Sequence, residues 1–292
     1  MSINNVIAKV ILGSGQFIGV NHYSHKKGIE RANHFMKIKN VLSIIEAAKE
    51  CGFGGMMIST HPTSIKILNE LSKNKRLKDN FQIYPNLPYM QKYVIGANEK
   101  GMVGFVLDML KSNSISNLAK GARAVLSNDL YKILKSLIEI ELSSFSKLEM
   151  GPVFLHNVLT DLALSLRIET IFHFYIEYIQ KQYGVKGGFV TLNFPELLKY
   201  FKEIGLDQPL IQAPFNKTGF QMNPSIDSNI TALKSFQGIF VAMTTLAAGF
   251  LGPREAYSYL SSIKNINSII VGASTNDHLK QSYNHIIEMK EN

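Results

Sequence analysis

Short apolar runs alternate with longer amphipathic stretches along the whole chain, and this alternation limits the fold more than any other feature. Runs that suit buried strands lie at 9–15, 54–60, 81–87, 152–157, 187–193, 208–214, 238–243 and 268–273. Helical periodicity fills the intervals, at 31–51, 63–74, 102–112, 127–147, 158–183, 195–204, 226–236, 253–263 and 275–288. Strands that are apolar on both faces and separated by helices form parallel sheets. Eight such units predict an α/β fold of the (β/α)8, or TIM-barrel, class.

The length of 292 residues suits one (β/α)8 domain that spans 1–292. The interval 88–150 is longer than one connection between strands needs, so we expect a helical insertion between the third and fourth strands. Its segments FVLDML and LYKILKSLIEIEL are apolar enough to pack on the barrel or against a second subunit. A homo-oligomer is therefore left open.

The segment LGSGQFIG, which begins at Leu12, carries glycines in a spacing that suggests a dinucleotide loop. A Rossmann loop needs a helix that begins at its last glycine, so that the helix amides meet the pyrophosphate. Here the helical pattern begins only near Arg31. We therefore expect these glycines to occupy crowded backbone positions of the first strand.

Composition limits the compartment and the partners. The net charge is +9, but the basic residues are scattered and not interleaved with aromatic residues, which argues against nucleic-acid binding and favours small anionic ligands. No apolar run reaches 18 residues and no signal peptide is visible, so we expect neither membrane insertion nor export. The single cysteine, Cys51, fits a reducing compartment. A cytoplasmic protein that acts on a small molecule is predicted.

Reactive groups of (β/α)8 barrels lie at the carboxyl ends of the strands. No Asp or Glu stands directly at a strand end, because Asp161 and Glu196 fall in the following helices; a two-carboxylate glycosidase is therefore poorly supported. Proton transfer falls to histidine or tyrosine. Three imidazoles at one mouth could hold zinc, but their wide spacing is a weak signal and no metal is assigned. The candidate catalytic residues are His22, Tyr23, His61, Tyr84 and His156.

The segment VGASTNDHL follows the eighth predicted strand and opens the last predicted helix. Ser274 or Thr275 can serve as its N-cap. The backbone amides at the start of this helix favour binding of an anion, which would approach them past Gly272. Barrels of this class often bind phosphate at this place. A capped helix with no ligand is the competing interpretation.

The segments from 152 to 284 resemble the aldo-keto reductases, a family of NADP(H)-dependent (β/α)8 barrels. VFLHN, with Asp161 downstream, is similar to the family's fourth strand, which ends in an active-site histidine, and VTLNF is similar to its fifth. IQAPFN resembles the sixth-strand pattern Gln-x-x-Tyr-Asn, VAMTTLAAGFL the seventh-strand segment, and VGASTNDHL the cofactor loop. In the first 150 residues only LGSGQF and the helix before ECGFGG carry the likeness.

The resemblance implies that NADP(H) binds at this mouth and that His156 faces the substrate. Asn193 and Gln212 would hold the nicotinamide carboxamide. The positions that would line the pyrophosphate and ribose phosphate are Thr244, Leu246, Ser274 and Thr275.

The chain departs from the family at the catalytic residues. ISTHPT has neither the Asp nor the Tyr expected after strand two, and FQIYPNLPY has no Lys. Met243 stands where the family has an aromatic residue that stacks on nicotinamide. The family's basic and amide groups that bind the adenosine phosphate are largely missing around Ala273, Leu279 and Ser282.

Three functions stay open. The first is an NADP(H)-dependent oxidoreductase that acts on a small carbonyl or hydroxyl compound, with Tyr23 or Tyr84 in place of the missing tyrosine and His156 orienting the carbonyl. The second is a lyase or hydrolase that uses His22, His61 and His156 on a phosphorylated small molecule. The third is a non-catalytic barrel that binds a ligand.

Overall fold

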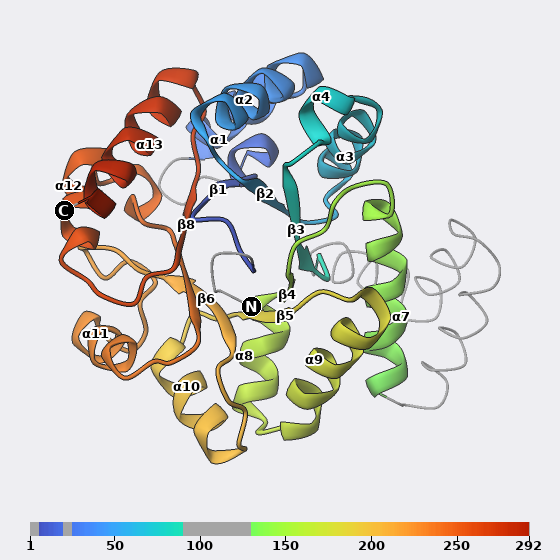
Figure 1. Cartoon of the computed structure of the whole chain (residues 1–292), viewed down its shortest axis with the longest axis vertical. Coiled ribbons are helices and arrows are strands. Elements are labelled where there is room, and N and C mark those ends of the chain that lie inside the picture. Colours follow the sequence, from blue (N-terminus) through green and yellow to red (C-terminus); the bar gives the residue numbers. More distant parts are fainter. Residues whose placement is uncertain (1–5, 20–24, 90–129, 292) are drawn as a thin grey trace.

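The computed structural model describes residues 6–19, 25–89 and 130–291. Its strands form one closed parallel ring in sequence order, in which β1 pairs with both β2 and β8 (Figure 1). The strands are β1 Val10–Gly13, β2 Gly55–Ile58, β3 Gln82–Leu87, β4 Val153–Leu155, β5 Gly187–Val190, β6 Leu210–Pro214, β7 Ile239–Met243 and β8 Ser268–Val271. The predicted (β/α)8 barrel is confirmed.

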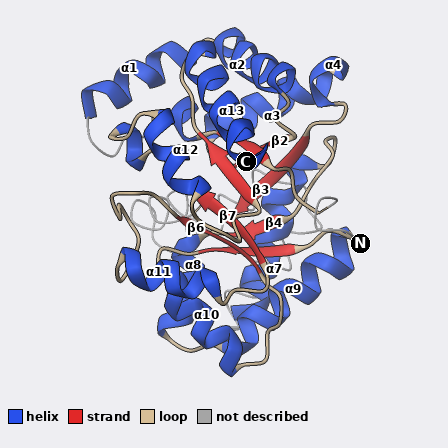
Figure 2. Ribbon diagram, turned by 60° about the vertical axis from the view of Figure 1, so that its left-hand side comes forward, coloured by secondary structure: helices blue, strands red, loops and turns tan. Residues whose placement is uncertain are grey.

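Helices surround the ring on all sides, which leaves the strands as a central layer in Figure 2. They are η2 Gly15–Ile18, α1 His25–Phe35, α2 Ile38–Cys51, α3 Pro62–Lys73, α4 Lys75–Lys78, α7 Leu130–Leu142, η3 Ser143–Phe145, α8 Asn157–Ser165, α9 Glu169–Tyr183, α10 Phe194–Glu203, α11 Ile226–Lys234, η4 Ala247–Gly249, α12 Pro253–Ser261 and α13 Asn276–Glu291. None of these helices is long and apolar enough to cross a membrane.

Alternate residues of each strand divide between two apolar cores. The larger core lies between the ring and the helices, and the smaller one fills the interior of the ring. Met57, Tyr84 and Phe154 are among the interior residues. Because side chains alternate along a strand, every second residue faces inward, and only the last inward residues reach the mouth.

The amino-terminal end of the ring interior is closed by Tyr84. Two glycines make room for its ring: a Cβ on Gly55 would lie 2.7 Å from the Tyr84 side chain, and one on Gly151 would lie 2.5 Å from it. The hydroxyl donates to Gln82 Oε1 (2.8 Å) and accepts from the Ala8 amide (3.0 Å). Tyr84 thus forms a packed floor at this end of the ring interior.

Two of the helices predicted as continuous are each divided into two helices in the structure. The predicted 31–51 helix is α1 and α2, with Lys37 extended between them, and the predicted 158–183 helix is α8 and α9, separated at Arg167 with φ +51°. The first helix also begins at His25, six residues before the predicted start near Arg31. The expected helical insertion between β3 and β4 is described only from α7 onward, since residues 90–129, which include FVLDML, lie outside the described chain.

The described part of the insertion packs on its own barrel. Leu134, Ile138 and Leu142 of α7 are buried in the larger core, and Glu139 of the same helix accepts a hydrogen bond from the Tyr178 hydroxyl of α9 (2.7 Å). Figure 1 shows α7 alongside α9. The apolar face of LYKILKSLIEIEL is thus covered within the chain.

The glycines near the start serve more than one purpose. Gly13 lies in β1, where a Cβ would meet Ile270 at 3.0 Å, as expected for a crowded strand position. Gly15 opens η2, and Gly19 ends it with φ +76°, a conformation that favours glycine. The expectation that all of them lie in the first strand was therefore wrong for Gly15 and Gly19.

Candidate functional site

A cavity of about 800 Å³ opens at the carboxyl ends of the strands. Residues from the ends of seven strands or from the segments after them line it, and among these are Gly13, Ser59, Asn86, His156, Gln212, Met243 and Gly272. None of the described residues that line it is an Asp or a Glu. The volume lies within the usual range for small-molecule and cofactor sites.

His156 begins the segment after β4 and caps helix α8. Its Nδ1 accepts a hydrogen bond from the Val158 amide (3.3 Å), so this nitrogen carries no proton in the neutral ring. Burial lowers the pKa of His156 below the ordinary histidine value of 6.5. The neutral imidazole therefore offers Nε2–H as a hydrogen-bond donor, and the residue lines the cavity.

His61 has the same local arrangement on helix α3. Its Nδ1 accepts from the Thr63 amide (3.1 Å), and burial lowers its pKa as well. However, His61 does not line the cavity; its ring lies edge-on to Tyr89, with 5.4 Å between the ring centroids. Its position is therefore one layer behind a residue of the cavity wall.

The two capping histidines predict how stability depends on pH. In the folded protein both pKa values lie below 6.5, so the unfolded chain takes up protons first, and stability present above pH 6.5 is lost as the pH falls towards the folded pKa values. Protonation of Nδ1 would also break each cap. We expect the free energy of unfolding, measured with urea from about pH 7.5 to 5.5, to decline with falling pH. The double variant His61→Asn, His156→Asn keeps both caps without titrating, and an unchanged slope in it would contradict this assignment.

Tyr84 lies far from the cavity, and the structure argues against the catalytic role that the sequence suggested. β3 continues to Leu87, so Tyr84 is three residues before the end of the strand and its hydroxyl is bonded at the amino-terminal end of the ring. Burial, with a further contribution from Glu149, raises its pKa to about 12. The predicted strand, 81–87, ends at the same residue as β3, so the error was to assign to the mouth a residue that lies three positions before that end.

Asn86 and Tyr89, from the same segment, line the cavity where Tyr84 was expected. Asn86 faces the interior two residues after Tyr84, and its Oδ1 is buried without a hydrogen-bond partner. Tyr89 follows the strand and lines the cavity, and burial raises its pKa. Alternation along QIYPNL separates the two inward residues, because Asn86 is nearer the carboxyl end of the strand than Tyr84.

Gln212 and Met243 form the neighbouring wall, on the paired strands β6 and β7. Gln212 is 4% exposed, its Nε2 donates to Met243 Sδ at 3.0 Å, and its Oε1 has no partner. Together with Asn86, Gln212 gives the cavity two buried amide oxygens that lack a donor. A buried acceptor without a donor costs free energy, which a ligand N–H or O–H group would recover.

Asn193 does not reach this cavity. Its backbone amide donates to Thr191 Oγ1 (2.9 Å), and its Oδ1 is buried without a partner. The segment is held from α8, where Asp161 accepts hydrogen bonds from the Thr191 hydroxyl and from the Leu192 amide (3.0 Å). Burial raises the pKa of Asp161, and these hydrogen bonds oppose that rise.

The segment after β7 wraps along one side of the cavity. Thr244 and Leu246 line it, as the resemblance implied. Thr244, Ala247 and Ala248 have φ values of +57°, +46° and +57°. Left-handed backbone at residues other than glycine costs roughly 1–3 kcal/mol each and is found preferentially at ligand sites. The chain thus accepts strain where it forms the cavity wall.

The segment after β8 completes that side. Gly272, Ser274 and His278 line the cavity, while the Thr275 hydroxyl accepts from the His278 amide (3.3 Å) and so caps α13. Of the two predicted N-caps, the structure thus selects Thr275, which does not line the cavity. Ser274 is left next to the amides of the first helical turn.

The proposed gathering of three imidazoles is not seen. His22 and Tyr23 lie outside the described residues, and His61 stands behind the cavity wall. In the part of the chain that the structure covers, no three His, Cys, Asp or Glu side chains are grouped so that they could hold a metal ion. Residues that the sequence did not single out as ligand contacts but that line the cavity include Gln16, Arg31 and Met57.

No protein-family model and no curated protein matches the sequence. Two solved structures of a candidate aldo-keto reductase from Pseudomonas aeruginosa are similar over 97% of this chain and 90% of theirs, at 13% and 12% identity and TM-scores of 0.59 and 0.60. An aldo-keto reductase from a Medee basin deep-sea metagenome library is similar over 98% of this chain and 91% of its own, at 12% identity and a TM-score of 0.53. At these identities the likeness establishes the fold alone: the chain folds as a (β/α)8 barrel similar to those of the aldo-keto reductases, from which its sequence diverges.

Proposed function

We propose that this barrel is an oxidoreductase that binds NADP(H) in the cavity and acts on a small carbonyl or hydroxyl compound. The observation that carries the proposal is the pair of buried amide oxygens, Asn86 Oδ1 and Gln212 Oε1, that line the cavity without donors. A carboxamide NH2 group offers two donors to such acceptors. Nicotinamide carries this group on a flat aromatic ring. Met57 and Met243 line the cavity, and methionine side chains pack favourably against such rings.

The rest of the cavity suits the anionic part of the same cofactor. Ser274 lies beside the first turn of α13, and Gly252 and Pro253 open α12 at the cavity edge. The amino-terminal ends of helices carry partial positive charge and free amides that attract phosphate. No lining carboxylate among the described residues opposes an anion. The residues therefore fit the cofactor at both its nicotinamide and its diphosphate parts.

His156 and Tyr89 are the side chains suited to the reacting oxygen. Bound nicotinamide would supply the redox chemistry. His156 Nε2–H would donate a hydrogen bond to the substrate oxygen, and Tyr89 would deliver the proton to it when a carbonyl is reduced, because its hydroxyl stays protonated when its pKa is raised. The family's Tyr and Lys are absent here, so this assignment replaces them with residues from the ends of β3 and β4.

A titration of the purified protein with NADPH, followed by the fluorescence of the reduced nicotinamide, tests the proposal. We expect saturable binding by the wild type and binding that is about 2- to 10-fold weaker in Gln212→Leu, because one hydrogen bond to the ligand is lost. Gln82→Leu is the matched control, since Gln82 lies at the amino-terminal end of β3, outside the cavity. Absence of wild-type binding at high micromolar NADPH would refute the proposed function.

A further inference from the structure

Helix α1 carries a charged residue on the face that it turns to the barrel. Gly28 and Phe35 are buried, and Ala32 is partly buried. Arg31 belongs to the same stripe, because positions 28, 31, 32 and 35 follow the i, i+3, i+4, i+7 spacing of one helix face. An inward position that is normally apolar is thus occupied by a guanidinium group.

Close packing fixes this face of α1 against η2. A Cβ on Gly19, at the end of η2, would lie 2.9 Å from both the Ala32 Cβ and the Gly28 carbonyl oxygen. Phe17 of η2 and Phe35 of α1 are both buried and meet edge-to-face, with centroids 5.0 Å apart. Arg31 is therefore held beside η2, and both contribute to the cavity wall.

Two other arginines have carboxylate partners. Arg76 pairs with Glu46 and Glu50, and Arg167 pairs with Glu203. Across residues 6–19, 25–89 and 130–291, no carboxylate pairs with Arg31, and none lines the cavity that it faces. A partly buried guanidinium is stabilised by a bidentate anionic partner, which the described residues do not provide here.

We propose that Arg31 binds the negatively charged group, a phosphate or a carboxylate, of the molecule that occupies the cavity. The guanidinium fork matches both anions in geometry. The inference rests on the proposed function for the source of the anion, which is either a phosphate of the nicotinamide nucleotide or the acid group of the carbonyl substrate. Arg31 then determines specificity, and neutral ligands of the same shape bind more weakly.

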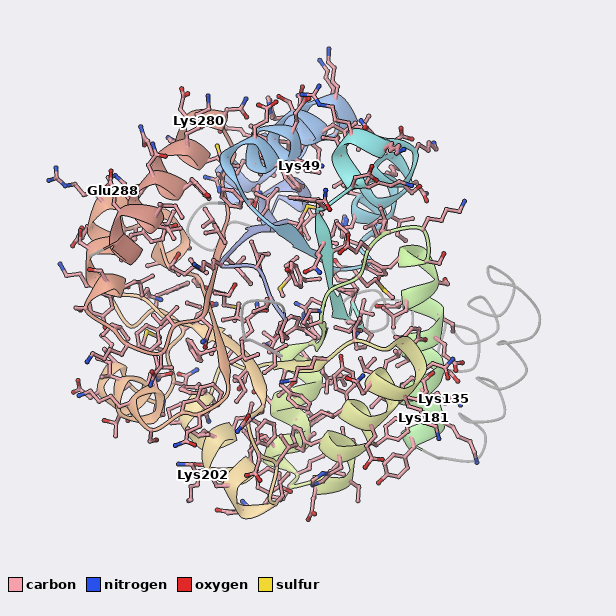
Figure 3. All side chains as sticks on the ribbon, viewed as in Figure 1. Lys49, Lys135, Lys181, Lys202, Lys280 and Glu288 are labelled. Carbon is pink, nitrogen blue, oxygen red and sulfur yellow. The ribbon has the colours of Figure 1, made fainter. Side chains whose placement is uncertain are left out.

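The nucleotide source is tested by calorimetric titration of NADPH and NADH into the wild type, Arg31→Gln and Lys280→Gln. Lys280→Gln is the control because it removes one positive charge, as Arg31→Gln does, but from the exposed side of α13. Figure 3 shows Lys280 on the outside of the helical ring. We expect at least about tenfold weaker binding in Arg31→Gln alone. A loss confined to NADPH assigns the extra phosphate to Arg31, and an equal loss for NADH assigns the diphosphate.

The substrate source is tested with 4-carboxybenzaldehyde and its methyl ester, which differ only in the charge of one group. If Arg31 binds a substrate acid, Arg31→Gln raises KM at least about tenfold for the acid and leaves the ester unchanged, while nucleotide affinity is kept. If Arg31→Gln alters neither nucleotide affinity nor the acid-to-ester ratio of KM, the proposal is overturned.

Titration with inorganic pyrophosphate separates this inference from the proposed function. Should the wild type bind neither nucleotide, the oxidoreductase assignment fails, and pyrophosphate then decides about Arg31 alone. Binding that weakens about tenfold in Arg31→Gln but not in Lys280→Gln supports the anion site. No wild-type binding of pyrophosphate, or equal binding by the two variants, overturns it.

Discussion

Replacing His156 with asparagine is expected to lower turnover at least about 100-fold while the protein stays folded. Asparagine is among the best N-cap residues, so its side-chain oxygen can accept from the Val158 amide as Nδ1 does now. The shorter side chain cannot place a donor where Nε2–H stands. NADPH oxidation with an electron-poor aromatic aldehyde measures the loss, and thermal unfolding verifies that the fold is kept.

The matched control is His61→Asn. It makes the same substitution at the same capping position of α3, but the ring it removes does not line the cavity. Its turnover should stay within a few-fold of the wild type. If His61→Asn and His156→Asn lose activity equally, the distinction drawn here between the two histidines is wrong.

Replacing Asp161 with alanine is expected to destabilise the protein by about 2–4 kcal/mol. The change leaves the buried Thr191 hydroxyl and the Leu192 amide without their acceptor. It also frees the segment that ends at Asn193. Urea unfolding at pH 7 measures the loss.

Asp161→Asn distinguishes hydrogen bonding from charge. Burial raises the pKa of Asp161, so the ionised carboxylate gains little from being charged in the fold. Asparagine keeps an acceptor for the Leu192 amide, and its cost should be near 1 kcal/mol. In the double variant with Thr191→Val the alanine penalty should shrink, because one unpaired donor is gone. Equal destabilisation by alanine and asparagine would show that the charge itself stabilises the fold.

The strands could be predicted from the sequence to within a few residues. Runs such as GGMMIST and VFLHN are apolar on both faces and are bounded by polar or glycine positions, which few other structures tolerate. β3 shows the limit of the method. Its predicted bounds, 81–87, nearly match Gln82–Leu87, yet Tyr84 was assigned to the mouth although Asn86 is the inward residue nearer the carboxyl end.

The helix boundaries were harder to predict because their causes are tertiary. The inward stripe of α1 at 28, 31, 32 and 35 and that of α2 at 41, 44, 45 and 48 lie about half a turn apart on one continuous helix. A single straight helix could not bury both, so the chain breaks between them. The break between α8 and α9 has no glycine or proline to signal it.

The candidate site was predicted in part. His156, Gln212, Thr244, Leu246, Gly272 and Ser274 line the cavity. All but Leu246 follow from the rule that strand ends and the segments after them carry the site, whereas Leu246 was implied only by the family resemblance. Arg31 does not follow from this rule, because it enters from the helix after the first strand. The sequence feature that marks Arg31 is a cation among the apolar residues of one helix face. This feature can be recognised only when the helix is known to begin before Arg31.

The uninterrupted circle of strand pairs has a consequence for how such a chain can evolve. Amide-to-carbonyl bonds between neighbouring strands do not depend on which side chains the strands carry, and a closed circle leaves no free edge that needs protection. Substitutions can therefore accumulate at the mouth, including the loss of an entire set of reactive groups, while the architecture survives. New chemistry can then be assembled from whatever residues the same rim presents.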